Sequence, residues 1–366
     1  MKKPACSVVV PVRDGAAFLA ESLPALVAAL PEDAELIVCD DGSRDGSAQV
    51  AATHGARVLP LEGTTGPAAA RNRGAHAAEG AILVFLDADV RVHADTILRL
   101  RRELDDPEVA AAFGSYDDRP PARTWPSLYK NLAHHFVHQR SRREASTFWA
   151  GCGAVKREAF LAAGGFDPVY RRPSVEDVEL GYRLRAAGHR IRLVPEAQVT
   201  HLKRWSLGGW IAADLRDRAV PWARLVRAGR ALPADLNFTA SDRAASALVG
   251  LALALGGASA WRAALLVPSL ACLAAAVALD RAFLAFAARR VSLAFAVAAA
   301  GMQVLHRAAG LVGFAYGYLF VDRMAESGGL GGPEGPPSLI GAPDSLRRPV
   351  KPRGLAGGRP RLEVIE

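Results

Sequence analysis

The sequence predicts an α/β fold in which a parallel sheet is flanked by helices. Short apolar runs alternate with amphipathic stretches at the spacing of βαβ units. One of these runs, AILVFL at residues 81–86, is typical of a strand buried on both faces and is followed by Asp87 and Asp89. Ligands of open α/β sheets bind at the carboxyl ends of the strands, so we expect a site at this edge.

The first half of the chain supplies most of the expected sheet. Strands are predicted at residues 7–12, 35–39, 56–61 and 81–86, and helices at residues 16–30, 45–55 and 67–78. Right-handed crossovers place the carboxyl ends of these strands on one edge, together with the polar segments 11–15, 40–43 and 87–89. No Gly-x-Gly-x-x-Gly follows the first strand, which argues against an ordinary dinucleotide-binding fold.

Asp87 and Asp89 are one residue apart, so in a continuing strand they would point the same way. Two carboxylates held this close repel each other. A divalent cation that also contacts a phosphate would offset that repulsion. The alternative interpretation is a solvated turn, for which Asp is well suited.

After residue 105 the pattern predicts strands at 109–115 and 190–200 and a helix at 124–141. That helix carries His134, His135 and His138 without a carboxylate or cysteine at zinc-type spacing, so we interpret them as surface or interface histidines.

A further helix is predicted from Ser174 to Ala187. Ser174 and Asp177 have the spacing of a capping box, so a purely structural role at the start of the helix is one reading of Glu176 and Asp177.

Composition narrows the class of partner. The 366 residues carry a net charge of +8, and the isoelectric point is about 9.6, which suits an anionic partner such as a nucleotide or an anionic membrane surface. Low aromatic content and the lack of a nucleic-acid-reading motif argue against nucleic acid. The four cysteines lack metal-ligand spacing and are interpreted as reduced thiols. The N-terminus has no sustained apolar segment, so no signal peptide is expected.

The C-terminal part predicts a membrane-associated region. We divide the chain into four predicted regions. Residues 1–205 form an α/β domain, and residues 206–243 form amphipathic interfacial helices. Residues 244–322 form two to four transmembrane helices, and residues 323–366 form a disordered cytoplasmic tail rich in Gly, Pro and Arg. The apolar runs lie at 244–260, 263–279 and 291–320. A buried soluble helical domain is the alternative. Lys and Arg are concentrated outside the runs, which predicts a multi-pass protein of the inner membrane whose N-terminal α/β domain is cytoplasmic.

Five motifs over residues 7–205 resemble those of the inverting glycosyltransferases of family 2, which have the GT-A fold. They are VPVRD at 10–14, DDGSRDGS at 40–47, the segment from Gly66 to ARNRG at 70–74, FLDAD at 85–89 and ED at 176–177. The resemblance implies a mixed, mostly parallel sheet flanked by helices. It also implies a nucleotide-sugar donor, UDP- or GDP-linked, and Mn²⁺ or Mg²⁺ as cofactor.

The resemblance also implies roles for individual residues. Asp177 would be the catalytic base, and Asp89 and His201 would contact the metal. The donor nucleotide would be bound by Pro11, Arg13, Asp14, Asp41, Ser43, Arg71 and Asp87, with Asp41 suited to the N3–H of uracil. The acceptor region would include Trp149, Gly151, Glu176, Arg204 and Trp205. The start of the helix is expected to favour the ionised form of Asp177.

One motif departs from the family's processive polysaccharide synthases, which share Gln-x-x-Arg-Trp. Here the segment reads His201-Leu202-Lys203-Arg204-Trp205. We therefore expect transfer of one sugar to a membrane lipid or lipid-linked acceptor. The alternatives are an enzyme of exopolysaccharide or cell-wall glycan synthesis, a nucleotidyltransferase, and an inactive membrane scaffold.

Overall fold

The computed structural model describes residues 3–227, 236 and 239–320. Within these residues it contains a nine-stranded sheet of order β3–β2–β1–β4–β8–β6–β9–β5, with β7 paired to β9. The strands are β1 (Cys6–Val12), β2 (Ala34–Asp40), β3 (Arg57–Pro60), β4 (Ile82–Leu86), β5 (Val90–Val92), β6 (Val109–Tyr116), β7 (Glu144–Ala145), β8 (Cys152–Lys156) and β9 (Arg190–His201). Strands β1 to β4 are parallel, whereas β8 is antiparallel to β4 and β6. The predicted mixed α/β sheet with flanking helices is confirmed.

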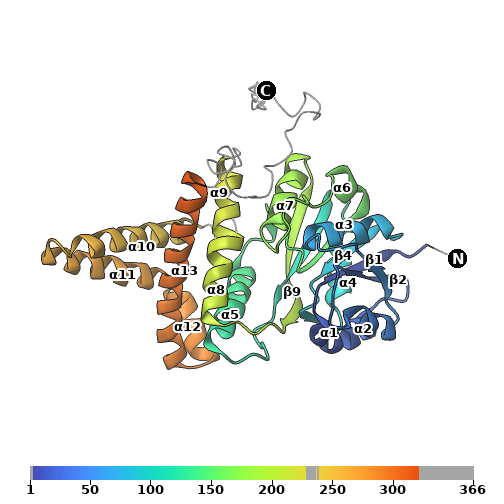
Figure 1. Ribbon diagram of the computed structural model, residues 1–366, viewed down its shortest axis with the longest axis horizontal. Helices are drawn as coiled ribbons and strands as arrows, with labels where there is room; N and C mark the ends of the chain where they lie inside the picture. Colours follow the sequence, from blue (N-terminus) through green and yellow to red (C-terminus); the bar gives the residue numbers. More distant parts are fainter. Residues whose placement is uncertain (1–2, 228–235, 237–238, 321–366) are drawn as a thin grey trace, which may run out of the picture.

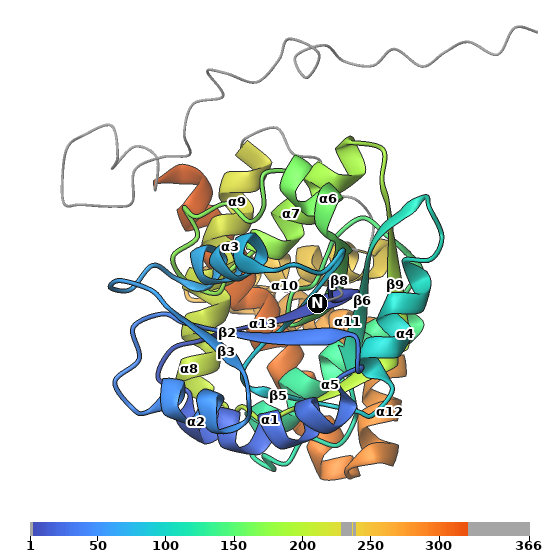
Figure 2. The ribbon, with the colours of Figure 1, turned by 90° about the vertical axis from the view of Figure 1, so that its right-hand side faces the viewer.

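Helices cover both faces of this sheet. They are α1 (Ala16–Ala29), α2 (Ser47–Thr53), α3 (Pro67–Ala77), α4 (Thr96–Glu103), α6 (Arg157–Ala162) and α7 (Glu176–Ala186). Figure 2 shows α1 and α2 below the sheet and α3, α6 and α7 above it. One hydrophobic core contains Leu23 and Leu100, and the core on the other face contains Phe160 and Leu184. The sheet is therefore buried on both sides, and the site is confined to its edge.

The strand that carries the two aspartates ends earlier than a continuing strand would. β4 stops at Leu86, and the amide of Val90 donates a hydrogen bond to the carbonyl of Asp87 (3.3 Å), which closes a turn. The strand predicted at residues 81–86 is therefore present, but it does not continue through Asp89, so the condition for the two side chains to point the same way is not met. The chain bends between Asp87 and Asp89, so the two carboxylates are held by different partners.

A second, helical layer packs against the α/β domain. It comprises α5 (Trp125–Arg140), α8 (Leu207–Ala212), the π-helix η1 (Ala213–Ala219), α9 (Val220–Arg227), α10 (Ala240–Ala258), the short 3₁₀ turn η3 (Ala263–Leu265), α11 (Leu266–Leu279), α12 (Arg281–Arg290) and α13 (Leu293–Leu319). Leu132 of α5, Trp210 of α8 and Phe295 of α13 share one core. Trp210 lies in the segment expected to form interfacial helices, but its side chain is fully buried in protein. Residues 323–366 lie outside the described residues.

Helices α10 and α11 form a hairpin that projects away from the α/β domain, beyond α13 (Figure 1). Within the described residues, one helix, Leu293–Leu319, is long and apolar enough to cross a membrane; a bent pair, residues 263–290, would add a second. By length and composition, the described helices therefore reach at most the lower end of the expected two to four crossings. Helix α13 contacts α5, η1, α9 and α12, and its Arg307 forms an ion pair with Asp280 (2.8 Å).

Candidate active site

A buried arginine joins the end of β4 to the start of α7. Arg71 of α3 donates from Nη2 to Oδ1 of Asp87 (2.6 Å) and from Nη1 to Oε1 of Glu176 (2.9 Å). Its side chain is 5% exposed, and that of Glu176 is 4% exposed. Burial alone would lower the pKa of Arg71, but the Asp87 and Glu176 carboxylates raise it above the usual value. The bridge places Asp177, the residue after Glu176, on the same side of the site as Asp87.

Asp177 is half-buried at the first turn of α7. Its Oδ2 accepts a hydrogen bond from the amide of Ala150 (3.1 Å), and its Oδ1 accepts one from the amide of Val178 (2.8 Å). Burial and the neighbouring Glu176 carboxylate nevertheless raise the pKa of Asp177 to about 7. The expected dominance of the helix start, which would favour the ionised form, is therefore wrong.

The capping box expected at this helix is also wrong. The N-cap of α7 is Val175, without a side-chain hydrogen bond. The amide of Ser174 instead donates to Oε2 of Glu176 (2.8 Å), so Glu176 has both oxygens engaged. Its carboxylate is thus part of the buried framework rather than exposed toward an acceptor.

Asp89 lies beside the end of β9. Its Oδ2 is 3.6 Å from Nε2 of His201, and the amide of Leu202 donates to its backbone carbonyl (2.8 Å). Although burial acts in the opposite direction, the His201 contact lowers the pKa of Asp89. The His201 ring stacks on Tyr116, with ring centroids 4.4 Å apart. These contacts fix the imidazole on the side facing Asp89.

These two side chains fit a divalent cation by their chemistry. Among the described residues no three His, Cys, Asp or Glu side chains cluster as a metal site. Asp89 supplies a hard carboxylate oxygen and His201 an imidazole nitrogen. A cation held by only one or two protein ligands completes its coordination with phosphate oxygens and water, as Mg²⁺ commonly does.

The loop after β1 contacts the loop after β2. The amide of Asp14 donates to Oγ of Ser43 (2.9 Å), and the amide of Arg44 donates to Oδ1 of Asp14 (2.8 Å). Arg13 is half-exposed next to Asp14. Pro11 is the register partner of Cys39 in β2. The structure therefore brings the residues expected to bind the donor at these two strands into one polar edge.

Asp41 is engaged within that edge. Its Oδ1 accepts from the amide and the hydroxyl of Thr65 (both 2.7 Å), and its Oδ2 accepts from the amide of Gly66 (2.9 Å). A Cβ at Gly66 would lie 2.4 Å from the carbonyl oxygen of Arg171. Asp41 therefore shapes the loop at residues 63–66, and its carboxylate accepts three hydrogen bonds from that loop.

Trp149 belongs to an aromatic cluster that includes Tyr116, the residue stacked on His201. Trp149 contacts Tyr116 (4.9 Å) and His134 (4.6 Å) between ring centroids. A Cβ at Gly151 would lie 2.7 Å from the Trp149 indole, so this position requires glycine for close packing. His138 is buried and its Nδ1 is 3.0 Å from the carbonyl of Gly114. Of the three histidines interpreted as surface or interface residues, His138 is instead buried against β6.

Arg204 and Trp205 lie apart from the carboxylates. The backbone of Trp205 is bound by Ser127 Oγ (2.8 Å) and Thr124 Oγ1 (3.2 Å) at the start of α5. Lys203 lies 4.2 Å from the centroid of the Trp205 ring, and Arg204 is exposed. Within the described residues, no hydrogen bond or ion pair joins Arg204 or Trp205 to Asp87, Asp89 or Asp177.

Sequence reasoning missed Tyr116 and the link from Arg71 to Glu176. Tyr116 ends β6, and a polar residue at a strand end was the available signal. The Arg71–Glu176 pair spans 105 positions, so no local pattern could reveal it.

Comparisons with known proteins agree with this geometry. The family model described as glycosyl transferase family 2 matches residues 7–162. A pre-mycofactocin glycosyltransferase of Mycobacterium tuberculosis is 31% identical over 215 residues, which is 56% of this chain and 44% of that protein. The chain thus spans less than half of this relative. An uncharacterised glycosyltransferase of Mycobacterium bovis is 33% identical over 174 residues, covering 47% of this chain and 76% of that protein.

A solved structure supports the fold. The mannosyltransferase from Pyrobaculum calidifontis, in complex with GDP-Man and Mn²⁺, matches with a TM-score of 0.53 and 22% identity over 87% of this chain and 88% of that chain. This structural match covers more of the chain than the family model, which matches residues 7–162. The chain belongs to glycosyltransferase family 2, has the GT-A fold and is a transferase.

Proposed function

We propose that this enzyme transfers one sugar, with inversion, from a UDP- or GDP-sugar to a membrane lipid or lipid-linked acceptor, and that it depends on a divalent cation. The observation that carries this proposal is the Asp87–Arg71–Glu176 bridge. It couples the strand end where a donor binds in this fold to the helix that carries Asp177. Donor and base are thereby held by one rigid, buried network.

Inversion requires a single in-line displacement at the sugar carbon. The acceptor hydroxyl loses its proton, the new glycosidic bond forms, and the nucleoside diphosphate leaves with the bonding electron pair. Asp177 has the properties of the base, because a pKa of about 7 makes its carboxylate a good proton acceptor near neutral pH. The hydrogen bonds from Ala150 and Val178 hold the carboxylate in a fixed orientation.

Asp89 and His201 are the residues that would hold the cation, Mn²⁺ or Mg²⁺. When bound, such a cation supplies Lewis-acid stabilisation of the negative charge on the diphosphate. The relative from Pyrobaculum calidifontis was solved with GDP-Man and Mn²⁺, which supports a nucleotide-sugar donor and a divalent ion here. Tyr116 stacked on His201 fixes the direction of the imidazole.

The α10–α11 hairpin supports the part of the proposal that names a membrane lipid or lipid-linked molecule as the acceptor. Trp261 between its arms is 89% exposed and Val267 is 73% exposed, and Leu270 and Leu253 are at least half exposed. An apolar surface of this kind on a projecting element favours contact with lipid. We infer that the hairpin enters the membrane, which keeps the active site near membrane-embedded acceptors and keeps the enzyme at the inner membrane.

A thermal-shift series with nucleotide sugars tests the donor and the metal. UDP-glucose, UDP-galactose and GDP-mannose are added with Mn²⁺ or with EDTA. A donor at 100 times its Kd should stabilise the fold by about 2.7 kcal/mol. One donor should raise the unfolding temperature, and more so with Mn²⁺.

The control for this series is Asp89→Ala, in which Mn²⁺ should no longer strengthen donor binding. Lack of any shift with all nucleotide sugars would contradict the proposal. So would release of pyrophosphate instead of nucleoside diphosphate during turnover, because that outcome identifies nucleotidyl transfer.

A further inference from the structure

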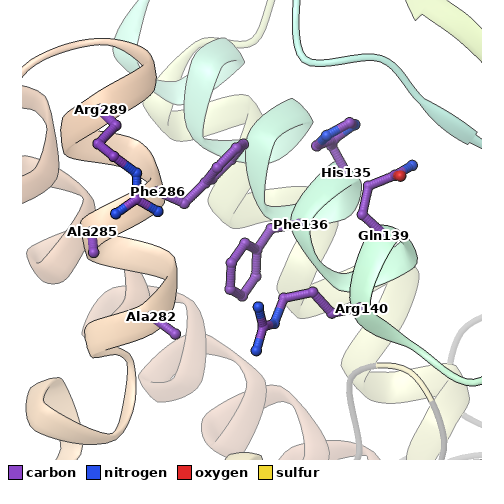
Figure 3. A pocket seen from close by; sticks show the side chains of 8 residues that line it. All are labelled: His135, Phe136, Gln139, Arg140, Ala282, Ala285, Phe286 and Arg289. Carbon is purple, nitrogen blue, oxygen red and sulfur yellow. The ribbon is translucent and has the colours of Figure 1, made fainter.

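Helices α5 and α12 enclose a groove of about 390 Å³ on the helical layer (Figure 3). Its lining combines an aromatic floor with two guanidinium groups. Phe136 and Arg140 come from α5, and Phe286 and Arg289 come from α12. The volume lies within the range of small-molecule pockets. None of these residues belongs to the candidate active site.

The aromatic floor is held by ring contacts. Phe136 and Phe286 have ring centroids 5.5 Å apart. His135 stacks on Phe286 at 5.9 Å, and its Nδ1 is 2.8 Å from the carbonyl of Tyr116. The floor is therefore a fixed apolar surface that is suited to a hydrocarbon chain.

The two arginines leave positive charge uncompensated. Within the residues that the structure describes, no carboxylate forms an ion pair with Arg140 or Arg289. Arg140 lies instead over the Phe136 ring, 5.2 Å from its centroid. Both residues are exposed. A surface that unites free guanidinium groups with an apolar floor is complementary to an amphiphilic anion.

The place of the groove in the fold identifies the class of amphiphile. Helix α12 begins two residues after α11 ends, and it turns by 64° from the preceding helical segment. It therefore starts at the base of the hairpin with the exposed apolar side chains. Leu293 and Val297, which follow α12, are 74% and 69% exposed. The groove thus lies beside the apolar surfaces that would contact lipid.

We propose that the groove binds an anionic phospholipid, with the phosphate at Arg140 and Arg289 and one acyl chain along Phe136 and Phe286. This site is separate from the acceptor site, and it orients the catalytic domain on an anionic bilayer. The inference goes beyond the transferase activity and does not depend on which sugar or acceptor the enzyme uses. It rests on the proposed contact of the α10–α11 hairpin with the membrane.

The test measures binding of a short-chain lipid, dihexanoyl phosphatidylglycerol, below its micelle concentration by isothermal titration calorimetry. A soluble lipid removes the general attraction of a charged membrane surface. Wild type should bind saturably and should bind dihexanoyl phosphatidylcholine more weakly. Hydrogen bonds to charged groups carry large energies, so Arg140→Gln and Arg289→Gln should each weaken binding at least tenfold.

Arg281→Gln is the matched control, because Arg281 is an exposed arginine on the same helix outside the groove. It should change the Kd less than twofold, and all variants should keep the wild-type unfolding temperature. Equal loss in Arg281→Gln, unchanged binding in the double variant Arg140→Gln/Arg289→Gln, or absence of wild-type binding would overturn the proposal. Inorganic phosphate that binds as tightly as the lipid would also overturn it.

The result of the lipid-binding test does not depend on the result of the donor-binding experiment. A double variant that loses lipid binding but keeps its Mn²⁺-dependent donor shift supports the groove independently of the transferase proposal. Conversely, a protein that binds the lipid but no nucleotide sugar leaves the groove intact and contradicts only the proposed reaction.

Discussion

Asp177 illustrates how an environment decides the chemistry of one residue. The sequence places it at the start of a helix, where the aligned backbone dipoles favour a carboxylate. Tertiary packing adds burial and the Glu176 carboxylate, and these raise the pKa of Asp177 to about 7. The second effect is larger, because the dipole contribution is modest and a desolvated charge is expensive. The carboxyl group therefore changes its protonation state near neutral pH, as the proposed role of base requires.

We expect the pH dependence of nucleoside diphosphate release to reflect the pKa of Asp177. Below pH 7 Asp177 becomes protonated and cannot accept a proton, so kcat/KM should fall about tenfold per pH unit. Asp177→Asn should lower kcat by about 10²–10⁴-fold at pH 8. Glu176→Gln removes a negative neighbour, so the acid limb of the pH–rate profile should move to lower pH.

Glu21→Gln serves as the control for that profile, because Glu21 lies on the exposed surface of α1 and pairs with Arg91. Its pH profile should match that of the wild type. An acid limb that stays in place in Glu176→Gln, or an Asp177→Asn enzyme with wild-type turnover, would contradict the assignment.

For Arg71, the sequence motif predicts contact with the donor, whereas the structure shows contacts with two protein carboxylates. Its motif resembles a donor-binding segment, yet its guanidinium is committed to two carboxylates and its side chain is buried. Buried ion pairs stabilise little on balance, but removing one partner leaves an uncompensated charge. Arg71 therefore acts on the site through the positions of Asp87 and Glu176.

At the scale of the secondary-structure elements, the composition of a C-terminal helix does not by itself predict which surfaces it contacts. Helix α13 passes as a membrane span by length and apolarity, yet it packs along the helical layer. Gly313 and Gly317 allow this close packing: a Cβ at Gly313 would lie 2.8 Å from that of Ala219, and a Cβ at Gly317 would lie 2.9 Å from Cα of Val220. Another part of α13 remains exposed, because Leu293, Val297 and Val312 are more than half exposed, as are Val267 and Leu270 of α11.

The hairpin predicts a measurable affinity for neutral lipid. Trp261→Ser/Val267→Ser should weaken partitioning into phosphatidylcholine vesicles, because two exposed apolar side chains would no longer be buried in hydrocarbon. Each is worth about 1.5–3 kcal/mol when fully buried, so a loss of at least 100-fold is expected in co-sedimentation.

Leu98→Ser is the control for the hairpin, since Leu98 is 44% exposed on α4 of the α/β domain. It should partition like the wild type. A hairpin variant that binds neutral vesicles as well as the wild type would show that other segments make the lipid contact.

At the scale of the whole molecule, the helical layer joins segments from both sides of residue 205, because α5 shares a core with helices that follow that residue. Leu128 and Leu132 of α5 are buried together with Trp210 and Phe283 of the helical layer. The predicted boundary at residue 205 therefore cuts through an apolar contact. The boundary marks the end of the sheet, but in a chain that ends there the apolar face of α5 would be exposed to solvent.

We expect a chain that ends at residue 205 to bind the dye ANS and to unfold at a lower temperature than the full chain. Leu132→Ser should destabilise the full chain by about 2–5 kcal/mol, because it empties a buried site, but should improve the solubility of the shortened chain. Thermal unfolding and light scattering of the four proteins measure both effects. Equal destabilisation of both lengths by Leu132→Ser would show that Leu132 is buried without the helical layer.

Much of the fold and the identity of several site residues follow from the sequence. The alternation of apolar strands and amphipathic helices predicts the parallel half of the sheet, because burial of both faces imposes a periodicity that is local in the chain. Polar residues at strand ends, such as Asp14 and Asp87, mark the edge for the same reason. These are short-range rules, and the sequence therefore determines where the site lies.

Only the tertiary structure decided how the site works. The Arg71–Glu176 pair, the stacking of Tyr116 on His201 and the shared core of α5 and α13 join segments far apart in the chain. The pKa of Asp177 depends on the burial that such contacts create. Likewise, composition cannot tell whether an apolar helix such as α13 is buried by protein or by lipid, because both environments exclude water equally well.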